Sequence, residues 1–230
     1  MRPSILIEVQ TAGTPFCEGV RSILVDTSTD LRAQALAFNV RRVDAILFTH
    51  THADHVLGLD DVRRYNQMQR TSIPCFSDDE TLLGLRRMFA YVFKPATQIG
   101  GGVPQLSLFR VAGPFTLGGV EIVPVRVYHG RLPVLGFRIG SFAYLTDCNR
   151  IPPESWPLLD GVRTLIVDAL RNRPHSTHFS VSEAIDVAAR VGSERAYLTH
   201  ICHELPHAET SRWLPAGVEL AYDGLVLEVP

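Results

Sequence analysis

The chain has 230 residues, 46% of them hydrophobic, and a formal net charge of -2 with a pI near 6.5. This length and apolar content suffice for one well-buried core, so we expect residues 1–230 to form a single domain. The near-neutral charge excludes a global basic field, so nucleic acid could bind only through local patches and is not favoured as a partner.

The cysteine spacing and the hydropathy of the chain indicate where in the cell the protein is expected. The four cysteines, Cys17, Cys75, Cys148 and Cys202, show no C-x-x-C spacing, which argues against a disulfide framework and against a thiolate zinc site. No apolar run reaches the roughly 18 to 20 residues that a membrane span needs. We therefore expect a cytoplasmic protein that has no membrane partner.

Short apolar runs rich in β-forming residues alternate with helical patterns along the whole chain. The expected strands are residues 5–9, 22–26, 45–49, 73–76, 106–111, 120–127, 134–139, 142–146, 164–167, 195–199, 219–222 and 226–229. The expected helices are about 30–38, 60–69, 80–92, 182–191 and 208–214, the fourth capped by Ser180 or Ser182. This order predicts the α/β class, with two packed sheets and outer helices in a four-layer αβ/βα sandwich.

One loop is dense in metal-binding side chains. His50, His52, Asp54 and His55 fall within six residues, directly after the expected strand 45–49. Alternate side chains diverge where an extended chain bends into a helix, so one such loop can direct ligands to two metal ions. Nitrogen and oxygen ligands without thiolate suit Zn²⁺ or Mn²⁺, and the sequence does not choose between them.

Later strand ends offer further ligands. His129, Asp147 and His200 each stand where an expected strand gives way to a loop, so the three could converge on one sheet edge. Two divalent ions, about 3.5 to 4 Å apart in known sites, lower the pKa of a bridging water, so hydroxide is the expected nucleophile. Asp26 and Asp168 also end strands, and each either orients a ligand imidazole or caps a turn.

The pattern H-x-H-x-D-H, followed by His, Asp and His, resembles the metallo-β-lactamase superfamily over most of the chain. The resemblance implies that fold. It also implies that one metal ion is held by His50, His52 and His129, that the second is held by Asp54, His55 and His200, and that Asp147 bridges them.

Several segments resemble the phosphoribosyl cyclic phosphodiesterase (PhnP-like) branch of that superfamily, including residues 26–28, 128–130 and 198–203. His178, followed by Ser182-Glu183-Ala184, also resembles a ribonuclease Z segment in which a His assists phosphodiester cleavage. The resemblance implies a phosphodiesterase acting on a small cyclic or nucleotide-like phosphodiester. Asp54 and His178 are its expected catalytic residues, and His178 serves as the general acid. His203 is an additional candidate to face the substrate or support a ligand.

The sequence departs from that branch at its start. The family's opening strand and Gly-rich loop are absent ahead of Arg2-Pro3-Ser4, so we expect the fold to lack the usual N-terminal strand. An exposed strand edge would favour a homodimer. Three alternatives stay open: an endonuclease resembling ribonuclease Z, a thioester or lactone hydrolase, and a non-catalytic metal-binding accessory protein. The endonuclease is disfavoured because residues 58–120 contain no basic arm.

Overall fold

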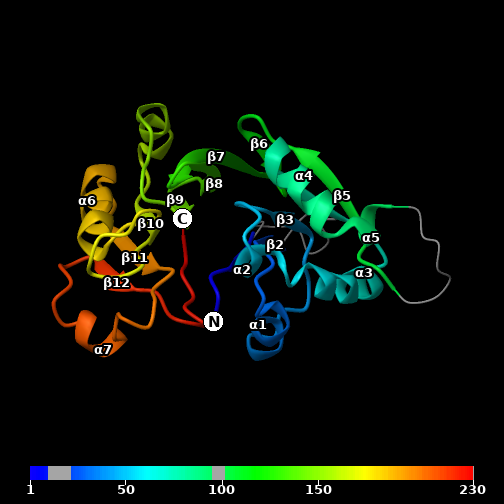
Figure 1. Cartoon of the computed structure of the whole chain (residues 1–230), viewed down its shortest axis with the longest axis horizontal. Coiled ribbons are helices and arrows are strands. Elements are labelled where there is room, and N and C mark those ends of the chain that lie inside the picture. The colour runs from blue at the N-terminus through cyan, green and yellow to red at the C-terminus, as the bar shows by residue number, and fades with distance from the viewer. Residues whose placement is uncertain (10–21, 95–101, 230) are drawn as a thin grey trace. The chain divides into compact units, whose positions relative to one another are not determined.

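The computed structural model describes residues 1–9, 22–94 and 102–229. By its internal contacts the chain divides into two compact units, which Figure 1 shows in the colours of the chain order. The first unit contains residues 1–112 and 116–120, and the second contains 113–115 and the residues from 121 onward. The expectation of a single domain therefore stays a prediction, and each unit is described by itself.

The first unit is built on a sheet with the strand order β1-β2-β3-β4-β5 in the described residues. Its strands are β1 (Ile5–Glu8), β2 (Ser22–Val25), β3 (Ala45–Leu47), β4 (Ile73–Ser77) and β5 (Leu106–Arg110). β1 is antiparallel to β2, and each later neighbour pair is parallel. β2 and β3 are buried at every residue, as expected for strands covered on both faces.

Helices of the first unit follow its strands along the chain. They are α1 (Leu31–Ala37), α2 (Ala53–Val56), the 3-10 helix η1 (Leu59–Val62), α3 (Arg63–Gln69), α4 (Asp79–Met88) and α5 (Ala90–Phe93). A core cluster that includes Leu31, Phe48, Val62 and Leu85 joins these helices to the sheet. Burial of an apolar helix face against a sheet is a dominant favourable term in folding.

The second unit is built on a sheet with the strand order β12-β11-β10-β9-β8-β7-β6. Its strands are β6 (Phe115–Leu117), β7 (Val120–His129), β8 (Leu132–Ile139), β9 (Phe142–Leu145), β10 (Thr164–Asp168), β11 (Arg195–Thr199) and β12 (Val218–Leu220). Strands β9 to β12 are parallel, whereas β7, β8 and β9 are joined antiparallel. Its helices are η2 (Pro153–Leu159), α6 (Val181–Val191) and α7 (His207–Thr210).

Helix α6 shows why local sequence predicted its start well. Ser180 accepts from the backbone N–H of Glu183, and the Glu183 side chain accepts from the backbone N–H of Ser180, a complete capping box. Gly192 ends the helix in the left-handed conformation with φ of 73°. Ser180, rather than Ser182, is therefore the cap.

The α/β class is confirmed, and several elements differ from expectation, among them the expected helix 208–214, which ends at Thr210. Residues 226–229 form no strand, and Val226 is 84% exposed, so their apolar alternation is not satisfied by burial. The expected helix 80–92 is interrupted at Phe89, whose φ of -110° and ψ of 44° are not helical. The short elements β6 and η2 were not expected, because a three-residue strand and a Pro-containing 3-10 turn carry little periodic signal.

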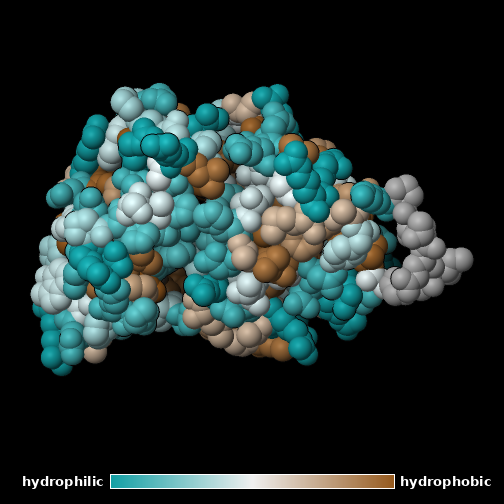
Figure 2. Space-filling model, viewed as in Figure 1, coloured by the Kyte–Doolittle hydropathy of each residue, from teal (hydrophilic) through white to brown (hydrophobic). Residues whose placement is uncertain are grey.

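Exposed apolar side chains occur on both units. On α4 and α5 they include Leu83, Met88 and Tyr91, and Figure 2 shows hydrophobic residues mixed with hydrophilic ones over these helices. Within the described residues, no helix combines the length and the hydropathy that a membrane crossing requires.

Candidate metal centre

Parallel strands bring polar side chains to one edge of each sheet. In the first unit, β2 and β3 pair in register at Val25 and Leu47, so Asp26 and the Thr49-His50 pair follow the same ends of neighbouring strands. In the second unit, Asp147, Asp168 and His200 lie at or after the ends of β9, β10 and β11, which are parallel. β7 is antiparallel to β8, and β8 to β9, so His129 ends its strand at this edge as well. The predicted convergence of His129, Asp147 and His200 is therefore seen within the second unit.

The first unit contains the His50–His55 group, which we define as His50, His52, Asp54 and His55. The ring centroids of His50 lie 4.5 Å from those of His52 and 4.4 Å from those of His55. His50 and His55 are buried and His52 is exposed. His55 Nε2 lies 4.0 Å from Asp54 Oδ2, and Arg2 Nη1 lies 3.8 Å from the same oxygen. Four side chains of metal-ligand type thus lie together in the first unit, and their division between two ions stays a prediction.

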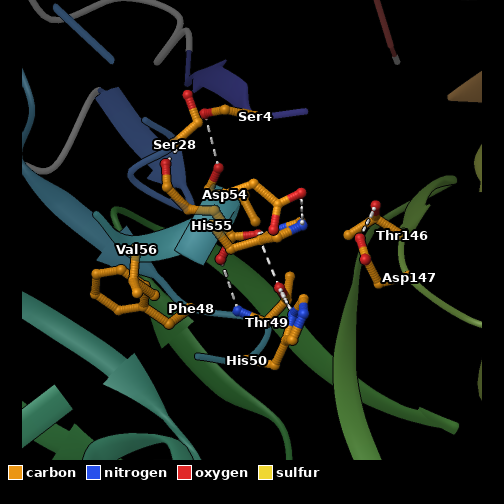
Figure 3. A network of polar contacts seen from close by, with 12 residues as sticks. Ser4, Ser28, Phe48, Thr49, His50, Asp54, His55, Val56, Thr146 and Asp147 are labelled. Carbon is orange, nitrogen blue, oxygen red and sulfur yellow. Dashed lines mark hydrogen bonds and ion pairs between the residues drawn. The ribbon is translucent and has the colours of Figure 1, made fainter. Parts of the chain in front are cut away.

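Asp26 orients two imidazoles of this group. Its Oδ2 lies 2.7 Å from His55 Nδ1 and accepts a hydrogen bond from Thr49 Oγ1 at 2.8 Å. Thr49 Oγ1 is in turn 2.9 Å from His50 Nδ1, a contact drawn in Figure 3. Because the Thr49 hydroxyl donates to Asp26, it accepts from His50 Nδ1. Both imidazoles then carry their hydrogen on Nδ1 and keep the Nε2 lone pair for a ligand bond.

Burial of Asp26 has an electrostatic consequence. The carboxyl is fully buried, and this burial raises its pKa above the ordinary value. His55 and Thr49 oppose the rise by charge and by hydrogen bonds to the carboxylate form. A buried carboxylate with this many donors is typical of the outer partner of a metal-binding His.

In the second unit, the group formed by Asp147, His178 and His200 also offers ligands. One donor atom from each of these residues lies within 4.8 Å of the other two. His200 Nε2 lies 3.3 Å from Asp147 Oδ1. Thr146 Oγ1 donates to Asp147 Oδ2 at 2.7 Å, and Figure 3 shows these two residues side by side. The ring of His129 lies 4.5 Å from that of His178, and His129 Nδ1 is 2.9 Å from the backbone oxygen of Thr177.

His178 is held by Asp168. His178 Nδ1 lies 3.0 Å from Asp168 Oδ2, and both side chains are buried. The same oxygen accepts from the backbone N–H groups of Cys148 and Phe179 at 3.2 Å each. Burial raises the pKa of Asp168, and the contacts with His178 oppose this rise. Asp168 therefore holds the His178 ring in place, and its role beside a metal ligand stays a prediction.

Backbone conformation sets the direction of three of these side chains. Asp26, Asp147 and His200 have φ of 63°, 51° and 58°, in the left-handed region that residues other than glycine seldom adopt. Each follows the end of a parallel strand, so the unusual φ turns the chain sharply out of the sheet. Such conformations persist where the surrounding structure enforces them, and they concentrate at functional sites.

The donor chemistry of these residues fits a divalent metal ion. Imidazole nitrogens and carboxylate oxygens are the ligands of zinc sites, and imidazoles with Nδ1 held by an oxygen present Nε2 for coordination. Three predicted residues, Asp26, Asp168 and His178, are buried beside these donors. His203 is exposed, three residues beyond His200.

Sequence reasoning missed three residues that hold the site. Thr49 links Asp26 to His50, Thr177 accepts from His129, and Asn149 makes hydrogen bonds on either side of His129. Each stands within two residues of a predicted site residue, and this proximity is the signal that could have identified them.

Comparisons with known proteins bear on the family and the fold of this chain. A family model described as beta-lactamase superfamily domain matches residues 21–201. A crystal structure described as a new diphosphatase from the PhnP family is 39% identical, with a TM-score of 0.86, over 100% of this chain and 85% of that one. The short form of human tRNase Z shares the fold, with a TM-score of 0.67 at 18% identity over 99% of each chain.

A longer curated relative is also similar. A Porphyromonas gingivalis protein named octanoyltransferase is 35% identical over 207 residues, which are 89% of this chain and 42% of that protein. This chain therefore spans less than half the length of that relative.

Proposed function

Because the chain belongs to the beta-lactamase superfamily and has the metallo-β-lactamase fold, we propose that this hydrolase cleaves small phosphodiesters with the help of divalent metal ions. The substrates we propose are cyclic or nucleotide-like. The observation that carries the proposal is the buried Asp168–His178 pair, which lies beside residues that could hold a metal ion. A held imidazole of this kind supplies an acid for an alkoxide leaving group, which phosphodiester hydrolysis needs.

We assign two ions, Zn²⁺ or Mn²⁺, to seven residues. His50, His52 and His129 would hold one ion, Asp54, His55 and His200 the other, and Asp147 both. The Nδ1 contacts of His50, His55 and His129 support this assignment, because an imidazole that donates from Nδ1 carries its lone pair on Nε2, the atom that can ligate zinc. When bound, such ions supply a hydroxide nucleophile at neutral pH and neutralise charge that develops on the phosphoryl oxygens.

The residues of the chain would then perform two further tasks. Asp168 stabilises the protonated imidazole of His178, and that imidazole donates its Nε2 proton to the leaving alkoxide. Asp26 keeps His50 and His55 in fixed orientations, so the ligands need little reorganisation during turnover. His203, being exposed, is assigned only a contact with the outer part of a substrate.

A second candidate is hydrolysis of a diphosphate bond, favoured by the name of the 39% identical PhnP-family relative. In a diphosphate diester, as in a phosphodiester, the attacked phosphorus bears two bridging oxygens. The leaving group differs, because a phosphate departs without a proton far more readily than an alkoxide does. Dependence on His178 therefore separates the two candidates.

The test is hydrolysis by metal-stripped protein reconstituted separately with Zn²⁺ and with Mn²⁺. The substrates are bis(p-nitrophenyl) phosphate, a nucleoside 2′,3′-cyclic phosphate, a dinucleoside diphosphate, a lactone and an octanoyl thioester. The thioester is included because of the name of the longer relative. We expect turnover of the phosphodiesters that requires added metal.

Other outcomes lead to other conclusions. Cleavage of the diphosphate alone would establish the second candidate. Cleavage of the thioester or lactone alone would refute phosphodiester hydrolysis, and inactivity towards all five would favour a non-catalytic metal-binding role.

A further inference from the structure

Asn149 connects segments of the second unit that each carry a site residue. It stands two residues after Asp147, and its backbone N–H donates to the oxygen of Tyr128 at 2.9 Å. Its side-chain Oδ1 accepts from the backbone N–H of Gly130 at 2.9 Å, and its Nδ2 donates to the oxygen of Ser176 at 2.8 Å. Two of these bonds flank His129, and the third reaches the loop that leads into His178.

Further contacts join the same three segments, which are the turn after β7, the residues after β9 and the loop before His178. His129 Nδ1 lies 2.9 Å from the Thr177 oxygen, and the Phe179 N–H donates to the Cys148 oxygen at 2.8 Å. A Cβ atom added at Gly130 would lie 2.9 Å from Thr177 Cγ2, so the turn after β7 and the loop before His178 approach closely. Gly130 also has φ of 64°, which glycine adopts at little cost.

We propose that Asn149 is a positioning residue that fixes His129 and the His178 loop relative to Asp147. This inference rests on the proposed function for the roles of His129 as a ligand and His178 as the acid. The amide is the side chain suited to the task, because one end must accept from an N–H and the other must donate to a carbonyl. We call this pair of side-chain hydrogen bonds the Asn149 bridge.

Two substitutions separate the halves of the Asn149 bridge. Asn149→Ala removes both hydrogen bonds. Asn149→Asp keeps an acceptor for the Gly130 N–H but places an oxygen against the Ser176 oxygen, so only the bond to the His178 loop is lost. The hydrogen bond to Gly130, which supports His129, should therefore be lost in Asn149→Ala and kept in Asn149→Asp.

The first unit offers a matched control. Asn66 makes bonds of the same kind: its Oδ1 accepts from Gln105 N–H at 2.9 Å, and its Nδ2 donates to the oxygens of Thr71 and Gln105 at 2.9 Å each. Asn66→Asp breaks an amide-to-carbonyl bond as Asn149→Asp does, at a position that contacts no proposed ligand. It measures what such a substitution costs the fold alone.

The first measurement is zinc affinity of the metal-stripped full-length variants, by competition with a chromophoric chelator. Asn149→Ala should weaken zinc binding by about 10- to 100-fold, the usual effect of losing a partner that orients a ligand. Asn149→Asp and Asn66→Asp should bind zinc as the wild type does, to within about threefold, since the ligand His129 remains supported.

The second measurement is the ring ¹⁵N spectrum of the histidines in the zinc-loaded protein. Asn149→Asp should shift the His178 signals and leave those of His129 in place, whereas Asn66→Asp should shift neither. Wild-type zinc affinity in Asn149→Ala, or unmoved His178 signals in Asn149→Asp, would overturn the inference. Neither readout uses turnover, so an inactive wild type would count against the proposed function and not against the Asn149 bridge.

Discussion

Asp26 holds two members of the His50–His55 group in place. It contacts His55 directly and His50 through Thr49, so one buried carboxylate orients two imidazoles. We expect Asp26→Asn to lower zinc affinity by about 10- to 100-fold, because the neutral amide holds the imidazoles less strongly. Isothermal titration with zinc measures this.

The matched control for Asp26 is Asp44→Asn. Asp44 is also a largely buried carboxylate of the first unit, and it accepts from Ser22 N–H and from Arg42 instead of from a histidine. Its substitution should leave zinc affinity unchanged. An equal loss in both variants would mean that the effect of Asp26 is one of general stability.

Asp54 differs from Asp26 because its side chain is 27% exposed. Its removal leaves no buried cavity, so Asp54→Ala should keep the fold and abolish hydrolysis by depriving one ion of a ligand. Circular dichroism and the bis(p-nitrophenyl) phosphate assay check the two halves of this expectation. Activity retained at the wild-type level would refute the two-ion mechanism.

His178 is expected to act only on the leaving group. His178→Ala should reduce turnover of a nucleoside cyclic phosphate by about 10² to 10⁴, the usual contribution of a positioned acid. The loss should be smaller for bis(p-nitrophenyl) phosphate, whose leaving group needs little protonation. Equal turnover by variant and wild type on the cyclic phosphate would remove His178 from the mechanism.

At the scale of elements, the segment after β2 is joined to helix α2 by backbone contacts. Thr27 N–H donates to the oxygen of His55 at 2.8 Å, and Gly58 N–H donates to the oxygen of Thr27 at 3.0 Å. A Cβ atom at Gly58 would lie 2.0 Å from the Ser28 oxygen. The approach that places Asp26 beside His55 therefore requires glycine at this position.

We expect Gly58→Ala to lower the free energy of unfolding by about 1 to 3 kcal/mol, as overpacking of a close contact does. Urea denaturation measures the change. Gly113→Ala is the control, because a Cβ atom at Gly113 would meet nothing within 4 Å. A Gly58→Ala variant as stable as this control would show that Gly58 and the Ser28 oxygen can move apart without loss of stability.

At the scale of the whole molecule, bound metal should stabilise the folded chain. Ligands that bind only the native state raise the free energy of unfolding, by about 2.7 kcal/mol at a concentration 100 times the Kd. Metal-stripped protein should therefore melt at a lower temperature in differential scanning calorimetry, and added Zn²⁺ or Mn²⁺ should restore the higher value.

The same measurement tests two of the proposed ligands. His55→Ala in the first unit and His129→Ala in the second should each reduce the zinc-dependent rise in melting temperature. A full rise in either variant would show that the histidine concerned is not a ligand. The homodimer remains a prediction of its own, for which light scattering on the full chain is the test.

The sequence by itself determined the kind of protein, because that information is local. The spacing of His50 to His55 and the positions of His129, Asp147 and His200 at strand ends are visible as short patterns. The strands that carry these residues are visible in the same way, because their apolar alternation and the turn residues that end them lie within a few positions of each other. Short elements such as β6 were not predicted, because three residues are too few to show a periodic pattern.

Only the tertiary structure decided which residues form hydrogen bonds with the site histidines and hold them in place. Asp26 and His55 are 29 residues apart and His129 and Thr177 are 48 apart, so no local pattern announces their contacts. The sequence left Asp26 and Asp168 open between capping a turn and orienting an imidazole, and only the structure shows that each is buried and in hydrogen-bond contact with a histidine. The role of Asn149 depends on three segments that meet through the pairing of β7, β8 and β9, and only the fold brings them together.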